Sequence, residues 1–306
     1  MFRMLSRYKH EGLTWVDLES PSRTEVRDIM TEFEITPLVA EELLLPSTKP
    51  RMETYPGHMY LVLHFPALRH SHKTREQEID FIIGSDFLIT TRYDTIDPLH
   101  NFSKIFEVNS VLSKNNLGDH AGFLFFYMLK KLYNAVEHEV EYIQHDLAVI
   151  EGHIFSGQEA EMVSAVSRSA RNLLNLRQTI EPHREVLREF ETSGPRFFGD
   201  NFAPYARALS NEYYRAHNHI VRHTDFLHEL RETNTALLST KQNDTMQRLT
   251  VITAIMAPLS ILTGIFGINA RYIPIVDLPA GFWILLALMG AMVAVTILIF
   301  KLERWL

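Results

Sequence analysis

The strongest constraint on this chain comes from its last quarter, which is almost free of charge. After Arg248, the only charged residues before the C-terminal tail are Arg271 and Asp277, and they separate two apolar runs, residues 249–268 and 281–300. At 1.5 Å per residue, an α-helix of about 20 residues crosses the ~30 Å hydrocarbon core of a bilayer. The sequence therefore predicts two transmembrane helices at these runs.

The basic residues indicate how these two helices are oriented. Four of them lie just outside the pair, at Lys241, Arg248, Lys301 and Arg304. The connecting loop, residues 269–280, contains only Arg271. Because basic residues collect on the cytoplasmic side, we expect a multi-pass protein of the cell (inner) membrane with both termini in the cytoplasm, including a tail at 301–306.

The segment before residue 119 is expected to form a cytoplasmic α/β domain, residues 1–118. Ser22 followed by Glu25 is a capping box and predicts a helix that runs to about Phe33. Apolar runs rich in β-branched and aromatic residues predict strands, with a turn at Gly84-Ser85-Asp86. The strands are expected at Leu13–Leu18, Met59–Pro66, Ile79–Ile83 and Phe87–Arg92.

From Asp119 onward the pattern becomes helical. One helix is expected to end near Phe155, and a second is expected at residues 158–191. Gly194-Pro195 predicts the break that follows. Residues 119–203 are thus expected to form a cytoplasmic helical hairpin.

A third, unusually long helix is expected after this hairpin. It begins at Pro204, and neither proline nor glycine occurs again before Pro258. The polar stretch 204–248 should therefore continue into the first membrane span as a stalk. A long polar helix is not stable by itself, so we expect it to pack against copies of itself.

Within this third helix, small and polar residues recur at alternating intervals of three and four, which places them in one seam. The seam consists of Asn243, Met246, Thr250, Thr253, Ala257, Ser260, Gly264 and Gly267. A lipid-facing stripe would be rich in Leu, Ile, Val or Phe. The seam is therefore either a tight helix–helix interface, where small residues are also enriched, or the wall of a pore shared by several copies.

The same register continues beyond both ends of the seam. Toward the cytoplasm it reaches Asp225, Glu229 and Glu232, which would attract cations into the vestibule of a pore or form the solvated face of a coiled coil. At the outer end, Asn269 follows Gly267. This asparagine is either a left-handed helix cap or part of an oxygen-lined mouth.

Two histidines of the stalk raise the question of a metal site. His219 and His223 are four residues apart, so their imidazoles share one helical face and can hold a Zn²⁺ together. The competing interpretation is an ordinary solvated face, because most such pairs bind nothing.

The composition argues against several other functions. The net charge of -7 argues against nucleic acid as a partner, and the absence of cysteine excludes disulfides and thiolate metal sites. No phosphate-binding glycine loop and no nucleophile–base pair stands out, so we expect neither an enzyme nor a cofactor. A membrane-tethered scaffold or receptor without transport remains the alternative from another class.

The residues around the first span also carry a family resemblance. Gly267-Ile268-Asn269 ends a span that contains Pro258, and a loop with Pro274, a second span and a basic tail with tryptophan follow. This block resembles the CorA superfamily of divalent-cation channels. Weaker similarities extend over the rest of the chain, at Trp15-Val16-Asp17-Leu18 with Pro21, Pro50-Arg51 with Glu53, Tyr60-Leu61-Val62-Leu63 and Phe87-Leu88-Ile89-Thr90.

The resemblance implies a homopentameric funnel in the lipid bilayer, in which the stalk and first spans line the pore. It assigns ion selectivity to Gly267, Ile268 and Asn269, where a ring of five Asn269 amide oxygens and the nearby Gly267 carbonyls would recognise a hydrated cation. The transported ion is then expected to be Mg²⁺, and also Co²⁺ or Ni²⁺.

Two departures from the family pattern bear on the ion. The usual motif has methionine at its centre, whereas this chain has Ile268, as do zinc-transporting members of the ZntB type. The acidic residue that commonly follows the loop proline is replaced by Ile275, and Arg271 is added near Asp277. Zn²⁺ transport of the ZntB type is therefore the alternative, and ion preference, direction and gating stay open.

Overall fold

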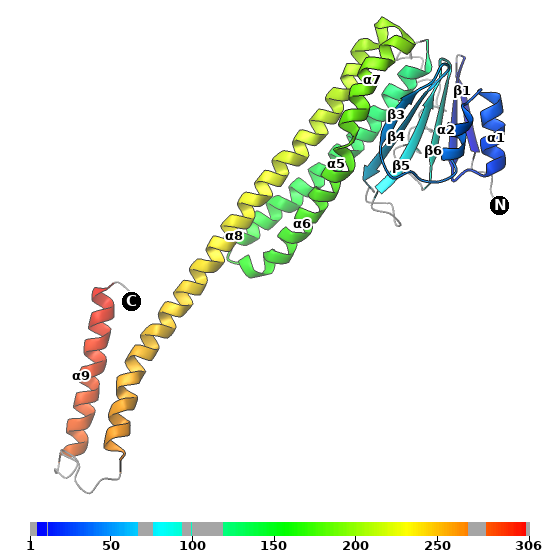
Figure 1. Cartoon of the computed structure of the whole chain (residues 1–306). Helices are drawn as coiled ribbons and strands as arrows, with labels where there is room; N and C mark the ends of the chain where they lie inside the picture. Colours follow the sequence, from blue (N-terminus) through cyan, green and yellow to red (C-terminus); the bar gives the residue numbers. More distant parts are fainter. Residues whose placement is uncertain are drawn as a thin grey trace. The chain divides into compact units, whose positions relative to one another are not determined.

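The computed structural model of the chain describes residues 5–10, 12–66, 76–93, 99, 119–268 and 280–303. It divides into two units, Met1–Arg231 and Glu232–Leu306, which are considered separately. The elements are labelled in Figure 1.

A six-stranded sheet forms the centre of the first unit. Its strands lie in the order β1-β2-β6-β5-β4-β3. Only β2 and β6 are parallel; every other neighbouring pair is antiparallel. The strands are β1 (Leu5–His10), β2 (Leu13–Glu19), β3 (Arg51–Thr54), β4 (Met59–Pro66), β5 (Glu76–Ile83) and β6 (Phe87–Arg92). The four predicted strands are confirmed, and β1 and β3 are additional.

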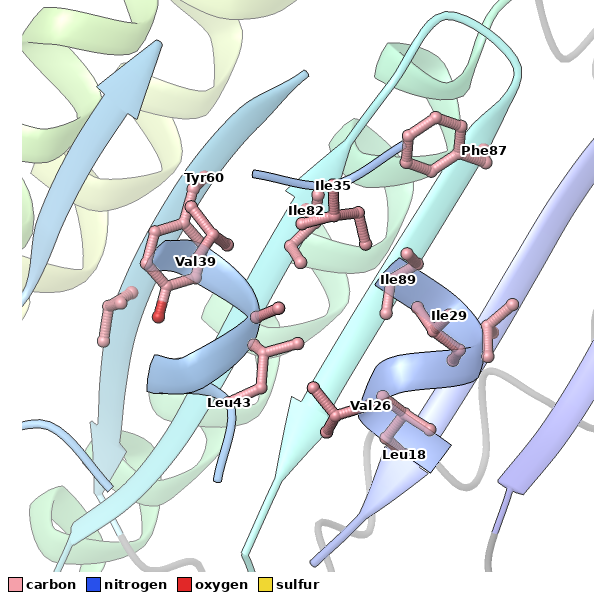
Figure 2. Close-up of a cluster of buried hydrophobic side chains, with 13 residues drawn as sticks. Leu18, Val26, Ile29, Ile35, Val39, Leu43, Tyr60, Ile82, Phe87 and Ile89 are labelled. Carbon is pink, nitrogen blue, oxygen red and sulfur yellow. The ribbon is translucent and has the colours of Figure 1, made fainter. Parts of the chain in front are cut away.

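Two short helices, α1 (Arg23–Glu32) and α2 (Pro37–Glu42), cover one face of this sheet. The predicted capping box is present: the Ser22 side chain accepts from the Glu25 backbone, and the Glu25 carboxylate accepts from the Ser22 backbone. Val26, Ile29 and Val39 pack onto apolar side chains of the strands (Figure 2). At about 25 cal/mol per Å² of apolar surface, this burial stabilises the helix–sheet layer far more than the cap does.

Three helices cover the opposite face: α5 (Ala121–Phe155), α6 (Glu159–Ile180) and α7 (His183–Phe198). Phe125 of α5 lies between Phe81 of β5 and Phe190 of α7, with ring centroids 5.2 and 5.0 Å apart in edge-on arrangements. Edge-to-face packing suits the quadrupoles of aromatic rings. The sheet is therefore enclosed between two helical layers.

The structure corrects the predicted helix at 158–191 and the predicted break at Gly194-Pro195. The chain breaks earlier, at Pro182, which cannot donate a backbone hydrogen bond and instead occupies the N-cap of α7. Helix α7 then continues through Pro195 to Phe198. Gly194 is buried, and a Cβ added there would lie 3.5 Å from the ring of Phe202 and 3.6 Å from that of Phe190. Gly199, with φ of 99°, ends the helix.

A buried relay joins this helical layer to the edge of the sheet. Tyr133 donates to Nδ1 of His183 at 2.9 Å, and Nε2 of His183 donates to the backbone carbonyl of His64 at 2.8 Å. That carbonyl lies two residues beyond Val62, the last β4 residue that pairs with β3. Burial lowers the pKa of His183 to about 3, so the imidazole is neutral and one tautomer satisfies both partners.

Replacing Tyr133 by phenylalanine should therefore destabilise the first unit. The change leaves Nδ1 of His183 without its donor in a dry site, which costs about 1–2 kcal/mol. Thermal unfolding of the full-length protein should show a midpoint lower by about 2–8 °C. Tyr127→Phe is the matched control, because Tyr127 is on the same helix and only half-buried. Equal effects of both changes would contradict the relay.

The long helix α8 (Ala203–Phe266) begins in the first unit and ends in the second. It starts one residue before the predicted Pro204 and runs unbroken past Pro258, as the sequence indicated. Its first turns pack into the first unit, and Arg215 forms an ion pair with Glu137 of α5 at 2.5 Å. The buried positions here follow a helical period: Ala206, Leu209, Tyr213, Ala216 and Ile220.

In the second unit, the last part of α8 is followed by α9 (Gly281–Leu302). Both helices are long and apolar enough to cross a membrane, and their apolar side chains are almost entirely unburied within the chain. The two apolar helices expected at 249–268 and 281–300 are thus confirmed. The domain boundaries drawn from the sequence remain predictions.

Candidate ion pathway

The predicted seam of α8 lies at the surface of the single chain. All eight of its residues, from Asn243 to Gly267, are exposed. On one side it is bordered by large exposed apolar side chains, among them Leu249, Ile252 and Met256. The helix therefore presents a stripe of small and polar residues beside a stripe of large apolar ones. Exposure in a single chain is expected both for a pore wall and for a helix–helix interface between copies, so both interpretations of the seam remain.

The hydroxyl groups of the seam have a defined orientation. Thr250 donates to the carbonyl of Met246 at 2.8 Å, and Thr253 and Ser260 donate to the carbonyls four residues before them at 2.9 Å. Each hydroxyl proton is thereby bound to its own helix. The outward part of each group is an oxygen with free lone pairs, which can accept hydrogen bonds from water around a cation.

The outer end of α8 depends on two glycines in different ways. The Gly267 backbone donates to the carbonyl of Thr263 at 2.8 Å, and a Cβ at Gly267 would lie 2.9 Å from that oxygen. A Cβ at Gly264 would meet no atom of the chain within 4 Å. Gly267 is therefore required by the chain's own last turn, whereas any need for Gly264 must come from outside the chain.

The mouth that was predicted beyond these glycines is only partly described. Ile268 is 58% exposed. Asn269, Arg271, Pro274, Ile275 and Asp277 lie outside the described residues. The assignment of Asn269 to a cap or to an oxygen-lined mouth thus stays a prediction.

The predicted vestibule residues Asp225, Glu229 and Glu232 are all exposed on α8. Their spacing of four and three keeps them on one side of the helix. A single chain does not bring them into a cluster, since they follow one another along one helix. They form a ring of charge only if several copies assemble around a common axis.

The predicted zinc pair, His219 and His223, is half-buried on the same helix. Burial lowers the pKa of His223, and electrostatic interactions with His219 and Arg222 lower it further. Among the described residues, no three of His, Asp or Glu are gathered so that they could hold a metal ion. The pair would need a further ligand from elsewhere, so zinc binding stays a prediction.

The structure also contains a polar cluster that was not predicted from the sequence. Glu78 and Asp80 are both buried, on the face of β5 that α1 and α2 cover. The strand expected at Ile79–Ile83 contained Asp80 and began just after Glu78, and no role was assigned to either acid. The available signal was the presence of two acids at positions i and i+2, which places both side chains on one face of a strand.

The chain is similar to known proteins over nearly its whole length. Residues 10–302 match the family described as CorA-like Mg²⁺ transporter protein. The chain is 26% identical over 298 residues to the cobalt/magnesium transport protein CorA of Thermotoga maritima, which covers 96% of this chain and 83% of the relative.

Two solved structures bear on the fold. The complete CorA magnesium transporter of Methanocaldococcus jannaschii matches with a TM-score of 0.82 at 19% identity, over 100% of this chain and 95% of that one. The ZntB cytoplasmic domain of Vibrio parahaemolyticus matches with a TM-score of 0.52 at 14% identity, over 76% and 87%. The expected α/β domain, long helix and two C-terminal apolar helices are thus confirmed as a fold that known proteins share.

Proposed function

Because the chain belongs to the CorA-like Mg²⁺ transporter family, we propose that it carries divalent cations, Mg²⁺ above all, across a membrane through a pore built from five copies. The observation that carries the proposal is the extent of the family match, which includes the first unit and both apolar helices. A tethered scaffold would not need a polar seam. The proposed pathway follows that seam of α8.

The chemistry of the seam supports passage of a hydrated ion. Mg²⁺ holds its water ligands tightly and prefers hard oxygen partners. The waters around such an ion are hydrogen-bond donors, and the hydroxyl oxygens of Thr250, Thr253 and Ser260 present acceptors, because their protons are bound to the helix. Neutral oxygens also bind the ion weakly enough to release it.

Selectivity is proposed to lie at the outer end, at Gly267, Ile268 and Asn269. A ring of five Asn269 amide oxygens would contact the water shell of the ion without removing it. At the other end, Asp225, Glu229 and Glu232 would raise the local cation concentration below the membrane. Both roles depend on assembly into a pentamer.

The energy for uptake need not come from ATP. A potential of 100 mV is worth about 2.3 kcal/mol per elementary charge, and so about twice that for a dication. With both termini in the cytoplasm, as the basic residues indicate, an inside-negative potential would pull cations from the mouth toward the vestibule. The direction of transport is then inward.

Uptake into liposomes that contain the purified protein tests this function. Mg²⁺, Co²⁺, Ni²⁺ and Zn²⁺ are compared with and without an imposed inside-negative potential. We expect Mg²⁺ entry that increases with the potential and does not require a pH gradient. Zn²⁺ entry that requires a pH gradient would instead indicate transport of the ZntB type, and no uptake of any ion would favour the tethered scaffold.

A further inference from the structure

The buried acids of β5 form a polar cluster within an otherwise apolar layer. Glu78 is 8% exposed and Asp80 is 1% exposed. Their strand partners on the same face are His64 of β4, opposite Glu78, and Thr91 of β6, opposite Asp80. The apolar part of this face, with Tyr60, Ile82 and Ile89, is shown in Figure 2.

The Glu78 carboxylate is fully engaged. Its two oxygens accept from the backbone N–H of Ser47 at 2.9 and 2.8 Å, and one of them also lies 3.1 Å from Nε2 of His64. Burial by itself would lower the pKa of His64, but the hydrogen bond and the charge of Glu78 outweigh it and raise the pKa. Glu78 therefore favours the protonated form of His64, which forms an ion pair with its carboxylate.

The Asp80 carboxyl group has no such cation. Tyr93 donates to its Oδ2 at 3.2 Å, while Oδ1 has no hydrogen-bond partner. Two buried oxygens from the neighbouring strands are also unpartnered, Tyr60 Oη and Thr91 Oγ1. Buried polar atoms of this kind require a water, an ion or a proton to satisfy them.

The other charges that face the pair are already engaged. Arg51 of β3 pairs with Glu42 of α2, and also with Glu53 at 3.1 Å. Glu76 of β5 accepts from Thr179 of α6 at 3.2 Å. Behind His64 the relay residue His183 is neutral. Asp80 thus lies beside the Glu78 carboxylate, and the Arg51 guanidinium is shared by two other carboxylates.

Two neighbouring carboxyl groups in a buried site do not both ionise. A metal ion does not fit this site, since no three ligating side chains among the described residues are gathered to hold one. Both oxygens of Glu78 and one of Asp80 are also occupied, which leaves a single free carboxyl oxygen. One free oxygen beside a neighbouring carboxylate is the arrangement that takes a proton.

We propose that Asp80 is a proton-binding site of the first unit, protonated at neutral pH beside the Glu78 carboxylate and deprotonated as the pH rises. Asp80 in this state can donate a hydrogen bond to the neighbouring Glu78. The site is separate from the ion pathway, and it holds whether or not the chain transports Mg²⁺.

The electrostatics give the sign of the pH effect. Burial raises the pKa of Asp80, the nearby Glu78 raises it further, and Tyr93 and Arg51 oppose the rise without reversing it. The folded state therefore keeps a proton that an unfolded Asp, with a pKa of about 3.9, has lost. The stabilisation is complete below the unfolded pKa and declines as the pH rises toward the folded pKa.

Thermal unfolding of full-length Asp80→Asn and wild-type protein, from pH 5 to pH 8.5, tests the proposal. An asparagine mimics the protonated carboxyl group, so the variant should unfold at a higher temperature than the wild type at pH 8, and the difference should shrink toward pH 5. The pH profile of the wild type alone is not sufficient, because His58, His120 and His183 also contribute to it. Burial lowers the pKa values of these histidines, so their contribution to stability increases as the pH rises, opposite to that of Asp80.

Asp86→Asn is the matched control, because Asp86 is an exposed acid in the turn that follows β5. It should leave the pH dependence unchanged. An Asp80→Asn profile parallel to that of the wild type would overturn the proposal. The proposal would also be overturned if 10 mM Mg²⁺ raised the unfolding midpoint of the wild type at pH 8 but not that of Asp80→Asn, since the site would then bind a metal ion.

Infrared difference spectra of the wild type keep the proposal testable if Asp80→Asn does not fold. The C=O band of a protonated carboxyl group should be present at pH 7 and lost at high pH. Its absence at pH 7 would show that Asp80 is already ionised and would overturn the assignment.

Discussion

Gly264→Leu is expected to lower Mg²⁺ uptake by about 100-fold or more. A Cβ at this position meets no atom of the chain within 4 Å, and leucine is a better helix former than glycine, so the chain itself tolerates the change. In a pentamer, five leucine side chains would narrow and dry the seam, and a hydrophobic constriction blocks hydrated ions. A 100-fold loss corresponds to about 2.7 kcal/mol of added barrier.

The neighbouring Ile265→Leu provides the control. Ile265 is 53% exposed on a different side of α8, and the change exchanges one apolar isomer for another. Uptake into liposomes at a fixed inside-negative potential is measured for both variants, together with the mass of the assembly by native mass spectrometry. Normal Mg²⁺ uptake by a pentameric Gly264→Leu variant would contradict the proposal that the seam forms the wall of a pore. Loss of the pentamer would instead favour the tight helix–helix interface.

Asn269→Ala is expected to reduce Mg²⁺ uptake by a similar factor and to weaken discrimination among dications. Each subunit would lose one amide oxygen that accepts a hydrogen bond from the ion's water shell. At about 0.5–1.5 kcal/mol per hydrogen bond, five such losses amount to several kcal/mol. Competition between Mg²⁺ and Co²⁺ in the same liposome assay measures the change in selectivity.

Two further variants make this test specific for the amide oxygen. Asn269→Gln keeps the oxygen and should retain part of the uptake. Asn269→Asp supplies a ring of carboxylates, which should bind the dication more tightly and slow its release. Normal Mg²⁺ uptake and selectivity in Asn269→Ala would show that this residue is a helix cap and that selectivity lies elsewhere.

The elements that follow from local chemistry could be predicted from the sequence. Ser22 and Glu25 form the capping box that their spacing indicates, and Gly84-Ser85-Asp86 turns between two strands. The two apolar helices are equally local, because their length and lack of charge decide the assignment. β1 was missed because its exposed, polar residues show little apolar alternation.

Other features depend on tertiary packing and could not be predicted in the same way. Gly194-Pro195 is a typical helix breaker, yet rings of Phe190 and Phe202 pack around Gly194 and α7 continues. The buried position of Asp80 depends on β4 and β6, which flank it only in the folded sheet. The roles predicted for the seam of α8 depend on other copies, so one chain leaves them as proposals.

The sheet edges described above have a further consequence for the proposed assembly of several copies. An exposed edge strand offers unpaired backbone groups to a neighbouring sheet and promotes aggregation. Here one edge strand is only Arg51–Thr54, and the other, β1, carries Arg7 and Lys9. Beyond the end of β3, the backbone carbonyl of His64 on β4 accepts a hydrogen bond from Nε2 of His183 and is therefore already engaged. Copies of the chain can therefore be crowded into one assembly without fusing their sheets into a continuous β-structure.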